Sequence, residues 1–209
     1  MIVKLDEFNL PEAANWLAER DDALAFVLQR YGPPPLWARA PGFSSLVHMI
    51  LEQQVSLASA NAAFQKLKAL IDPVEPATFL ALSDETLRNI GFSRQKTHYC
   101  RTLAQAVDSG DFDFEQLHIM PDDAVRDEMK RLKGIGDWTA DIYLSECLMR
   151  PDILPKGDIA MQEAFRVLNG LPKRPVHDDF VQATTHWRPW RSVGARLLWH
   201  FYLEVRGEK

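Results

Sequence analysis

The chain has 209 residues, of which 46% are hydrophobic and 25% are charged, and its formal net charge is −5. This length and composition suit one globular unit or two small lobes that share a core, and they exclude a disordered or collagen-like chain. The first ten residues, MIVKLDEFNL, carry charges and no long apolar run, so we expect neither a signal peptide nor a membrane span. A net acidic chain also lacks the overall basic charge that is typical of DNA-binding domains.

Helical spacing of apolar residues recurs along the chain, whereas strand-like alternation is almost absent, so the sequence predicts an all-α fold. The segment Glu52-Gln53-Gln54-Val55-Ser56 falls inside the longest pattern, with Val55 on its apolar stripe. In chain order, the first helices are expected in 11–30, from Phe43 or Ser44 to Leu70, from Thr78, and after the cap Ser83. The next are expected over 94–107, from Pro121 into a turn at Gly134, and from Asp137 or Trp138 onward. The last are expected over 159–168 and through Trp199 and Tyr202.

The two cysteines, Cys100 and Cys147, are too few for a disulfide framework or for an iron–sulfur cluster held by four thiolates. A reduced, cytoplasmic protein fits this count best. Basic residues gather in two segments, 88–101 and 188–196, although the chain is acidic overall. Such patches attract a polyanion at short range, but we expect each single side chain in them to lie on a solvated helix face.

A glycine-bracketed turn, Gly134-Ile135-Gly136, separates two helical patterns. Glycine lets the backbone take a positive φ and approach a ligand without an intervening Cβ. The amides of Gly136, Asp137 and Trp138 begin a helix, where backbone N–H groups lack internal partners and bind anions, and Ile135 should point into the core. Taken alone, the turn indicates a tight helix–helix connection. With a helix on each side and Thr139 following, it favours sequence-independent contact with a nucleic-acid duplex.

A lone carboxylate, Asp158, follows one helix and a loop later and begins the helix from Ile159. An Asp at this position caps a helix, which stabilises it by roughly 1 kcal/mol. The same geometry suits chemistry, because a fixed negative charge that faces a pocket stabilises a developing sugar cation or positions a water molecule. Asn caps nearly as well but lacks the charge, so the substitution Asp158→Asn separates the two roles.

These residues resemble a known family. The segment LKGIGDWTA at 132–140, followed by LPKGD at 154–158, resembles the helix-hairpin-helix, Gly/Pro-Asp superfamily of DNA glycosylases. LEQQVS at 51–56, GFSRQK at 91–96 and WRPWRS at 187–192 are similar to its alkylpurine branch, the 3-methyladenine DNA glycosylase II (AlkA) type. The resemblance covers about 43–202, and because few residues precede Phe43, we do not expect the extra N-terminal β domain of longer members.

The resemblance implies base-excision repair, in which the N-glycosidic bond of an alkylated base flipped out of duplex DNA is hydrolysed. It makes Asp158 the catalytic aspartate and makes Gln54 the wedge that fills the gap left by the flipped base. Na⁺ or K⁺ at the hairpin carbonyls is a further family feature, and no other cofactor is implied. The residues that it implies in DNA binding are Gly134, Ile135, Gly136, Asp137, Thr139, Gln53, Gln54, Arg94 and Lys96.

Trp138 stands where the family members that also cleave the DNA backbone carry a lysine, whose amine forms a Schiff base. The resemblance therefore implies a monofunctional enzyme with water as the nucleophile. Aromatic faces attract a cationic alkylated base by roughly 0.5–2 kcal/mol, and the side chains expected to line the base pocket are Trp138, Trp199, Ile142, Ile159 and Phe43. Trp187 and Trp190 are expected in the core.

This sequence departs from the family at several positions. Lys133 and Asp137 replace a Pro and an Arg that are common around the hairpin, and Asp137 puts a negative charge beside the phosphate site, which should weaken DNA affinity. Ile142 and Ile159 replace tyrosines of some members, so a less aromatic pocket and a different substrate range are expected.

The sequence thus predicts an all-α, two-lobed protein with lobes of 43–120 and of 1–42 plus 121–209. Asp158, Trp138 and Trp199 should meet in the cleft between the lobes. We expect a monomeric, cytoplasmic enzyme of bacterial type that binds double-stranded DNA and removes 3-methyladenine- and 7-methylguanine-type lesions. The alternatives are a mismatch or oxidised-base glycosylase of the same superfamily and a DNA-binding module without catalysis.

Overall fold

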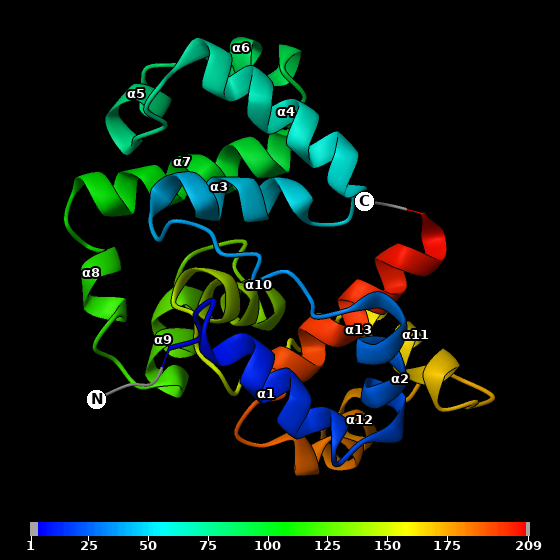
Figure 1. The fold of residues 1–209 in the computed structure, drawn as a ribbon. Coiled ribbons are helices and arrows are strands. Elements are labelled where there is room, and N and C mark those ends of the chain that lie inside the picture. Colours follow the sequence, from blue (N-terminus) through cyan, green and yellow to red (C-terminus); the bar gives the residue numbers. More distant parts are fainter. Residues whose placement is uncertain (1–3, 208–209) are drawn as a thin grey trace. The chain divides into compact units, whose positions relative to one another are not determined.

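The computed structural model describes residues 4–207, which form helices and connecting loops without a strand (Figure 1). The predicted all-α class is therefore confirmed. By their internal contacts, the residues group into two compact units: unit 1 combines Met1–Ala38 with Leu144–Lys209, and unit 2 is Arg39–Tyr143. The contacts thus place residues 121–143 with the middle helices, whereas the lobes expected from the sequence place them with the chain's two ends. Within 4–207, no helix has both the length and the apolar character needed to cross a membrane.

Unit 2 is built on α3 and α7, which pack against each other, with α4 on α3 and α5 and α6 on α7 (Figure 1). Several of its helices begin with a side-chain cap, including Ser83 before α6, which the sequence predicts, and Ser93 before α7. The helices of this unit are α3 (Phe43–Glu52), α4 (Leu57–Leu70), α5 (Pro76–Leu80), α6 (Asp84–Asn89), α7 (Arg94–Asp108), α8 (Phe114–Leu117), α9 (Asp122–Lys130) and α10 (Asp137–Ile142).

Unit 1 packs its helices around α13, which contacts α1, α2 and α11. A π-helical turn, η1 (Tyr143–Cys147), continues α10 in the chain and contains the boundary between the two units. The other elements of this unit are α1 (Asn9–Ala18), α2 (Asp22–Tyr31), α11 (Ile159–Leu168), α12 (His177–Ala183), the 3-10 turn η2 (Thr185–Trp187) and α13 (Arg191–Arg206).

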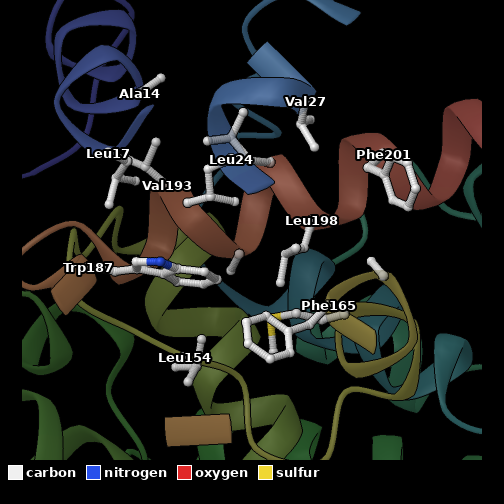
Figure 2. Close-up of a cluster of buried hydrophobic side chains, with 14 of the residues drawn as sticks. Ala14, Leu17, Leu24, Val27, Leu154, Phe165, Trp187, Val193, Leu198 and Phe201 are labelled. Carbon is white, nitrogen blue, oxygen red and sulfur yellow. The ribbon is translucent and has the colours of Figure 1, made fainter. Parts of the chain in front are cut away.

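The core of unit 1 gathers apolar side chains from α1, α2, α11 and α13 around Trp187, as Figure 2 shows. Trp187 is 1% exposed and packs edge-on against Phe165 and Phe180, with ring centroids 6.3 and 6.2 Å away. Its indole Nε1 donates a 2.7 Å hydrogen bond to Asp21, which also caps α2. The prediction that Trp187 is a core residue is confirmed, and Trp190 packs against the same core.

The expected single helix from Phe43 to Leu70 is wrong, because the chain breaks between α3 and α4. Gln53 leaves helical geometry with ψ 123°, and Gln54 has a left-handed φ of 58°. Ser56 then caps α4 by accepting a 3.2 Å hydrogen bond from the Ser59 amide. Val55, expected on the buried stripe, is instead exposed on this loop. The pattern in 11–30 is likewise two helices, separated by the cap Asp21.

Candidate functional site

The glycine turn forms a hairpin between α9 and α10, and its two glycines do different things. Gly134 has φ 93°, and a Cβ placed on it would overlap the ring of Tyr99 from α7. Gly136 has an ordinary extended backbone, begins α10 as its N-cap, and a Cβ there would meet no atom within 4 Å. A positive φ is thus needed at Gly134 only, whereas Gly136 leaves open space at the start of α10. Ile135 is 6% exposed, which confirms that it points inward.

Two ion pairs link the helices on either side of the hairpin. Arg126 of α9 donates a 2.7 Å hydrogen bond to the carboxylate of Asp141 on α10, which is 3% exposed. Lys130 lies 3.0 Å from Asp137, and its hydrogen bond with that carboxylate raises the pKa of the lysine. The negative charge of Asp137, expected to repel a phosphate, is therefore offset by a neighbouring cation.

Gln53 connects the loop after α3 to the hairpin. Its side-chain nitrogen Nε2 donates hydrogen bonds to the carbonyl oxygen of Gly134, at 2.9 Å, and to Oγ1 of Thr139, at 3.1 Å. Gln53, which the resemblance assigns to DNA binding, therefore uses its side-chain nitrogen within the protein. The next residue, Gln54, is exposed at the tip of the same loop.

The segment 88–101 is only partly a free basic surface. Nζ of Lys96 donates a 2.6 Å hydrogen bond to the Leu51 carbonyl at the end of α3, and burial lowers the pKa of this lysine. Arg101 donates hydrogen bonds to the carboxylate of Asp84 and to the carbonyl oxygens of Leu80 and Leu82. Arg94, in the first turn of α7, is exposed. Of the two residues expected to contact DNA here, Arg94 is exposed, whereas Lys96 uses its ammonium group in a hydrogen bond within the protein.

The segment 188–196 is structural. Arg191 and Arg188 bind the carboxylate of Asp152, at 2.6 and 2.9 Å. Arg196 is fully buried, and it donates to the carbonyl oxygens of Ser145, Ser192 and Leu36. Burial lowers the pKa of Arg196 to about 10. The expectation of a solvated helix face is wrong for Arg196, because its guanidinium satisfies buried backbone carbonyls.

Asp158 is the N-cap of α11 in unit 1, as predicted. Its Oδ1 accepts a 2.8 Å hydrogen bond from the Met161 amide, and the residue is 8% exposed. The loop before it is pinned to the start of α13. Ser192 binds this loop through the Pro151 and Arg150 carbonyls and the Ile153 amide. The carboxylate is thus held by its own helix and by an anchored loop.

The expected pocket residues divide between the two units. In unit 1, Trp199 is half-buried edge-on to Trp37, with ring centroids 6.3 Å apart, and Ile159 is 64% exposed beside Asp158. In unit 2, Trp138 is half-buried in the first turn of α10. The remaining two residues of unit 2 are buried: Phe43, which packs on Phe79, and Ile142. Their joint lining of one pocket stays a prediction.

The hairpin carbonyls expected to hold a monovalent cation already accept protein hydrogen bonds at two positions. Gly134 accepts from Gln53 at 2.9 Å, and Gly136 accepts from the Ala140 amide at 3.0 Å. A carbonyl oxygen has a second lone pair, so the cation stays a prediction. Within the described part of the chain, no group of three or more His, Cys, Asp or Glu side chains could hold a metal ion.

A half-buried histidine, His48, lies in α3, one turn before Glu52. The ring of His48 stacks on Phe64 with centroids 4.2 Å apart, and its Nε2 lies 3.6 Å from the Glu52 carboxylate. Arg39 binds both oxygens of Glu52, at 3.1 and 3.0 Å. Burial lowers the pKa of His48 below its ordinary value of 6.5, although Glu52 raises it and Arg39 lowers it further.

We expect His48 to make the protein less stable in mild acid. Neutral, half-buried His48 contributes to the free energy of unfolding, and its protonation opposes folding. Because the unfolded chain takes up this proton at higher pH than the folded protein, the contribution is complete above pH 6.5 and is lost as the pH falls through the lowered pKa of the folded state. The free energy of unfolding, measured in urea from about pH 7.5 to about pH 5, should fall less steeply in His48→Leu than in wild type. His98→Leu, at an exposed position of α7, is the control. Equal slopes in wild type and His48→Leu would contradict this expectation.

Comparison with known proteins adds a family to this geometry. Residues 47–189 match the family "HhH-GPD superfamily base excision DNA repair protein". The chain is 26% identical over 187 residues to DNA-3-methyladenine glycosylase 1 of Schizosaccharomyces pombe, covering 88% of this chain and 82% of the relative. It is 27% identical over 169 residues to a DNA-3-methyladenine glycosylase of Bacillus subtilis, covering 75% of this chain but 56% of that longer protein.

A solved structure shares the fold. The structure of a Schizosaccharomyces pombe 3-methyladenine DNA glycosylase in complex with abasic DNA superimposes with a TM-score of 0.83, at 23% identity. The match covers 93% of this chain and 97% of the other. The all-helical architecture is therefore that of a known DNA glycosylase.

Proposed function

The chain belongs to the HhH-GPD superfamily of base excision DNA repair proteins, and we propose that it is a monofunctional DNA glycosylase for alkylated purines of the 3-methyladenine and 7-methylguanine type. One observation carries the proposal: the family match includes both the hairpin and Asp158, and Asp158 is a buried carboxylate at a helix start. The names of the relatives, DNA-3-methyladenine glycosylases of a yeast and a bacterium, support the substrate class.

Asp158 carries the chemistry in this proposal. When the N-glycosidic bond breaks, its electron pair leaves with the base and the sugar becomes electron-poor. A carboxylate fixed by its own helix stabilises that positive charge without reorganising. Water then adds to the sugar carbon and loses a proton. An alkylated purine already carries positive charge on its ring, so it leaves easily and needs little help from a general acid.

The hairpin binds DNA in this proposal without reading its sequence. The amides at the start of α10 point a positive helix end towards a phosphate, and the bare Gly136 lets the DNA backbone come close. Gln54 fills the gap that the flipped base leaves. Trp138 and Trp199 face the cationic base by cation–π attraction. The proposed enzyme needs no cofactor and works as a monomer.

The test is base release from duplexes that carry one defined lesion. The protein should release 3-methyladenine and 7-methylguanine, and it should release uracil or 8-oxoguanine far more slowly. Release of uracil or 8-oxoguanine alone would favour a mismatch or oxidised-base glycosylase. Binding to abasic DNA without release of any base would favour a DNA-binding module.

Borohydride trapping tests the monofunctional mechanism. Trp138 offers no amine for a Schiff base, so reduction during turnover on a methylated duplex should leave no covalent protein–DNA complex on a denaturing gel. The abasic product should also stay uncut until it is treated with alkali. A trapped complex would show that another amine of the chain attacks the sugar.

A further inference from the structure

We propose that Gln53 is a positioning residue that holds the wedge loop, defined here as residues 53–56, at a fixed distance from the hairpin at 132–136. Gln54 then enters the duplex at a set distance from the phosphate that the hairpin binds. This inference rests on the proposed function, because it assumes that the hairpin and Gln54 both contact DNA. It goes further in giving Gln53 a role between them rather than on the nucleic acid.

The hydrogen bonds of Gln53 carry the first step. Its Nε2 donates to the Gly134 carbonyl at 2.9 Å and to Thr139 Oγ1 at 3.1 Å, so one side chain holds both the hairpin turn and the first turn of α10. The Gly134 carbonyl can only accept, which fixes the orientation of the amide group. Both amide hydrogens are therefore used within the protein.

Helix α7 connects the end of α3, directly before the wedge loop, with the hairpin. Its Lys96 binds the Leu51 carbonyl at 2.6 Å, two residues before Gln53. Its Tyr99 ring lies against Gly134, where it leaves no room for a Cβ. The wedge loop and the hairpin are thus joined directly through Gln53 and indirectly through α7. The loop cannot shift relative to the hairpin without losing one of these contacts.

The backbone of Gln54 supplies the reason for such bracing. A non-glycine residue in the left-handed region costs about 1–2 kcal/mol, and Gln54 has φ 58°. Val55, the next residue of the loop, is 46% exposed, and Leu57 at the start of α4 is 58% exposed, so burial of their side chains does not hold the loop. The contacts at its base, made by Gln53 and by the buried, Arg39-bound Glu52, hold it instead.

The experiment is a double-mutant cycle on Gln53 and Gln54, and one of its two readouts, the distortion of the bound duplex, does not require catalysis. The variants are Gln53→Leu, which keeps the size but removes both donors, Gln54→Ala, and their combination. Gln65→Leu, on the exposed face of α4, is the matched control. Each protein is bound to a duplex that contains an abasic-site analogue beside 2-aminopurine, whose fluorescence rises when its neighbours unstack. Base release from a methylated duplex is measured in parallel.

We expect Gln53→Leu to lower kcat/KM for base release about 10-fold or more and to reduce the 2-aminopurine signal at saturating protein. The effects of coupled neighbours are non-additive. Adding Gln53→Leu to Gln54→Ala should therefore lower kcat/KM by less than about threefold. Independent losses that multiply in the double variant would overturn the inference, and so would a full fluorescence signal in Gln53→Leu.

A second variant keeps the test possible if Gln53→Leu does not fold properly. Gln53→Glu keeps the length of the side chain but places a carboxylate, which cannot donate, opposite the Gly134 carbonyl. This variant should therefore also reduce the 2-aminopurine signal. If Gln53→Leu melts well below wild type, Gln53→Glu supplies the cycle. Failure of the proposed function looks different, because wild type would then release no base although the fluorescence cycle could still be measured with abasic DNA.

Discussion

Replacement of Asp158 by Asn should remove nearly all base release from alkylated duplex DNA. The substitution exchanges a fixed negative charge for a neutral amide of the same shape. Electrostatic groups that stabilise a charged transition state are typically worth about 100- to 1,000-fold in rate, so we expect a loss in this range or larger. The effect should fall on kcat, because the carboxylate acts on the sugar as it becomes positive.

The fold should survive this change. The Asp158 side chain caps α11 through the Met161 amide at 2.8 Å, and Asn is about as good an N-cap as Asp. Thermal unfolding of Asp158→Asn should therefore stay close to that of wild type. Asp158→Ala is the matched comparison, because it also removes the cap, which costs about 0.5–2 kcal/mol.

Rates of base release and unfolding curves for the three proteins separate chemistry from capping. Asn and Ala should be equally inactive, whereas only Ala should be less stable. An Asn variant with wild-type activity would show that Asp158 serves α11 alone. Any folded variant without the carboxylate should still bind abasic DNA, so this binding shows whether an inactive variant is folded.

Local signals explain why α11 and its cap were predictable from the sequence. Asp158 precedes an apolar helical pattern, and Asn169-Gly170 ends it. Residues next to the helix therefore predict both of its boundaries. The helical pattern of 94–107 likewise predicts α7. Short-range capping needs no knowledge of the rest of the fold, and these predictions are confirmed.

The failures come from contacts between residues far apart in the chain. Apolar spacing continues from α3 into α4, so nothing local reveals that Gln53 leaves the helix to bind Gly134, 81 positions away. The overlap that a Cβ at Gly134 would cause depends on Tyr99, which no motif indicates. Arg196 looks like a surface residue in sequence, and its burial follows from backbone carbonyls that only the folded chain brings together.

The two hairpin glycines should respond to alanine in opposite ways. Gly134→Ala forces a side chain into the left-handed region, at about 1–2 kcal/mol, and drives its Cβ into Tyr99, for which overpacking costs about 1–3 kcal/mol more. Gly136→Ala keeps an extended backbone that any residue adopts, and its Cβ meets no protein atom within 4 Å. Gly134→Ala should therefore be much less stable, and Gly136→Ala should unfold like wild type.

Affinity for DNA, unlike stability, should be impaired in the Gly136→Ala variant. If a phosphate approaches the amides at the start of α10, the methyl group of Gly136→Ala occupies the space it needs. Affinity for a duplex with an abasic-site analogue should then fall about 10-fold or more, as when one charge-assisted hydrogen bond of about 1.5–3 kcal/mol is lost. Lys133→Ala, in the same hairpin, controls for a simple loss of positive charge, and its effect should shrink in high salt. A folded Gly136→Ala with wild-type affinity would place the DNA backbone elsewhere, because an open glycine at a helix start matters only if something comes close to it.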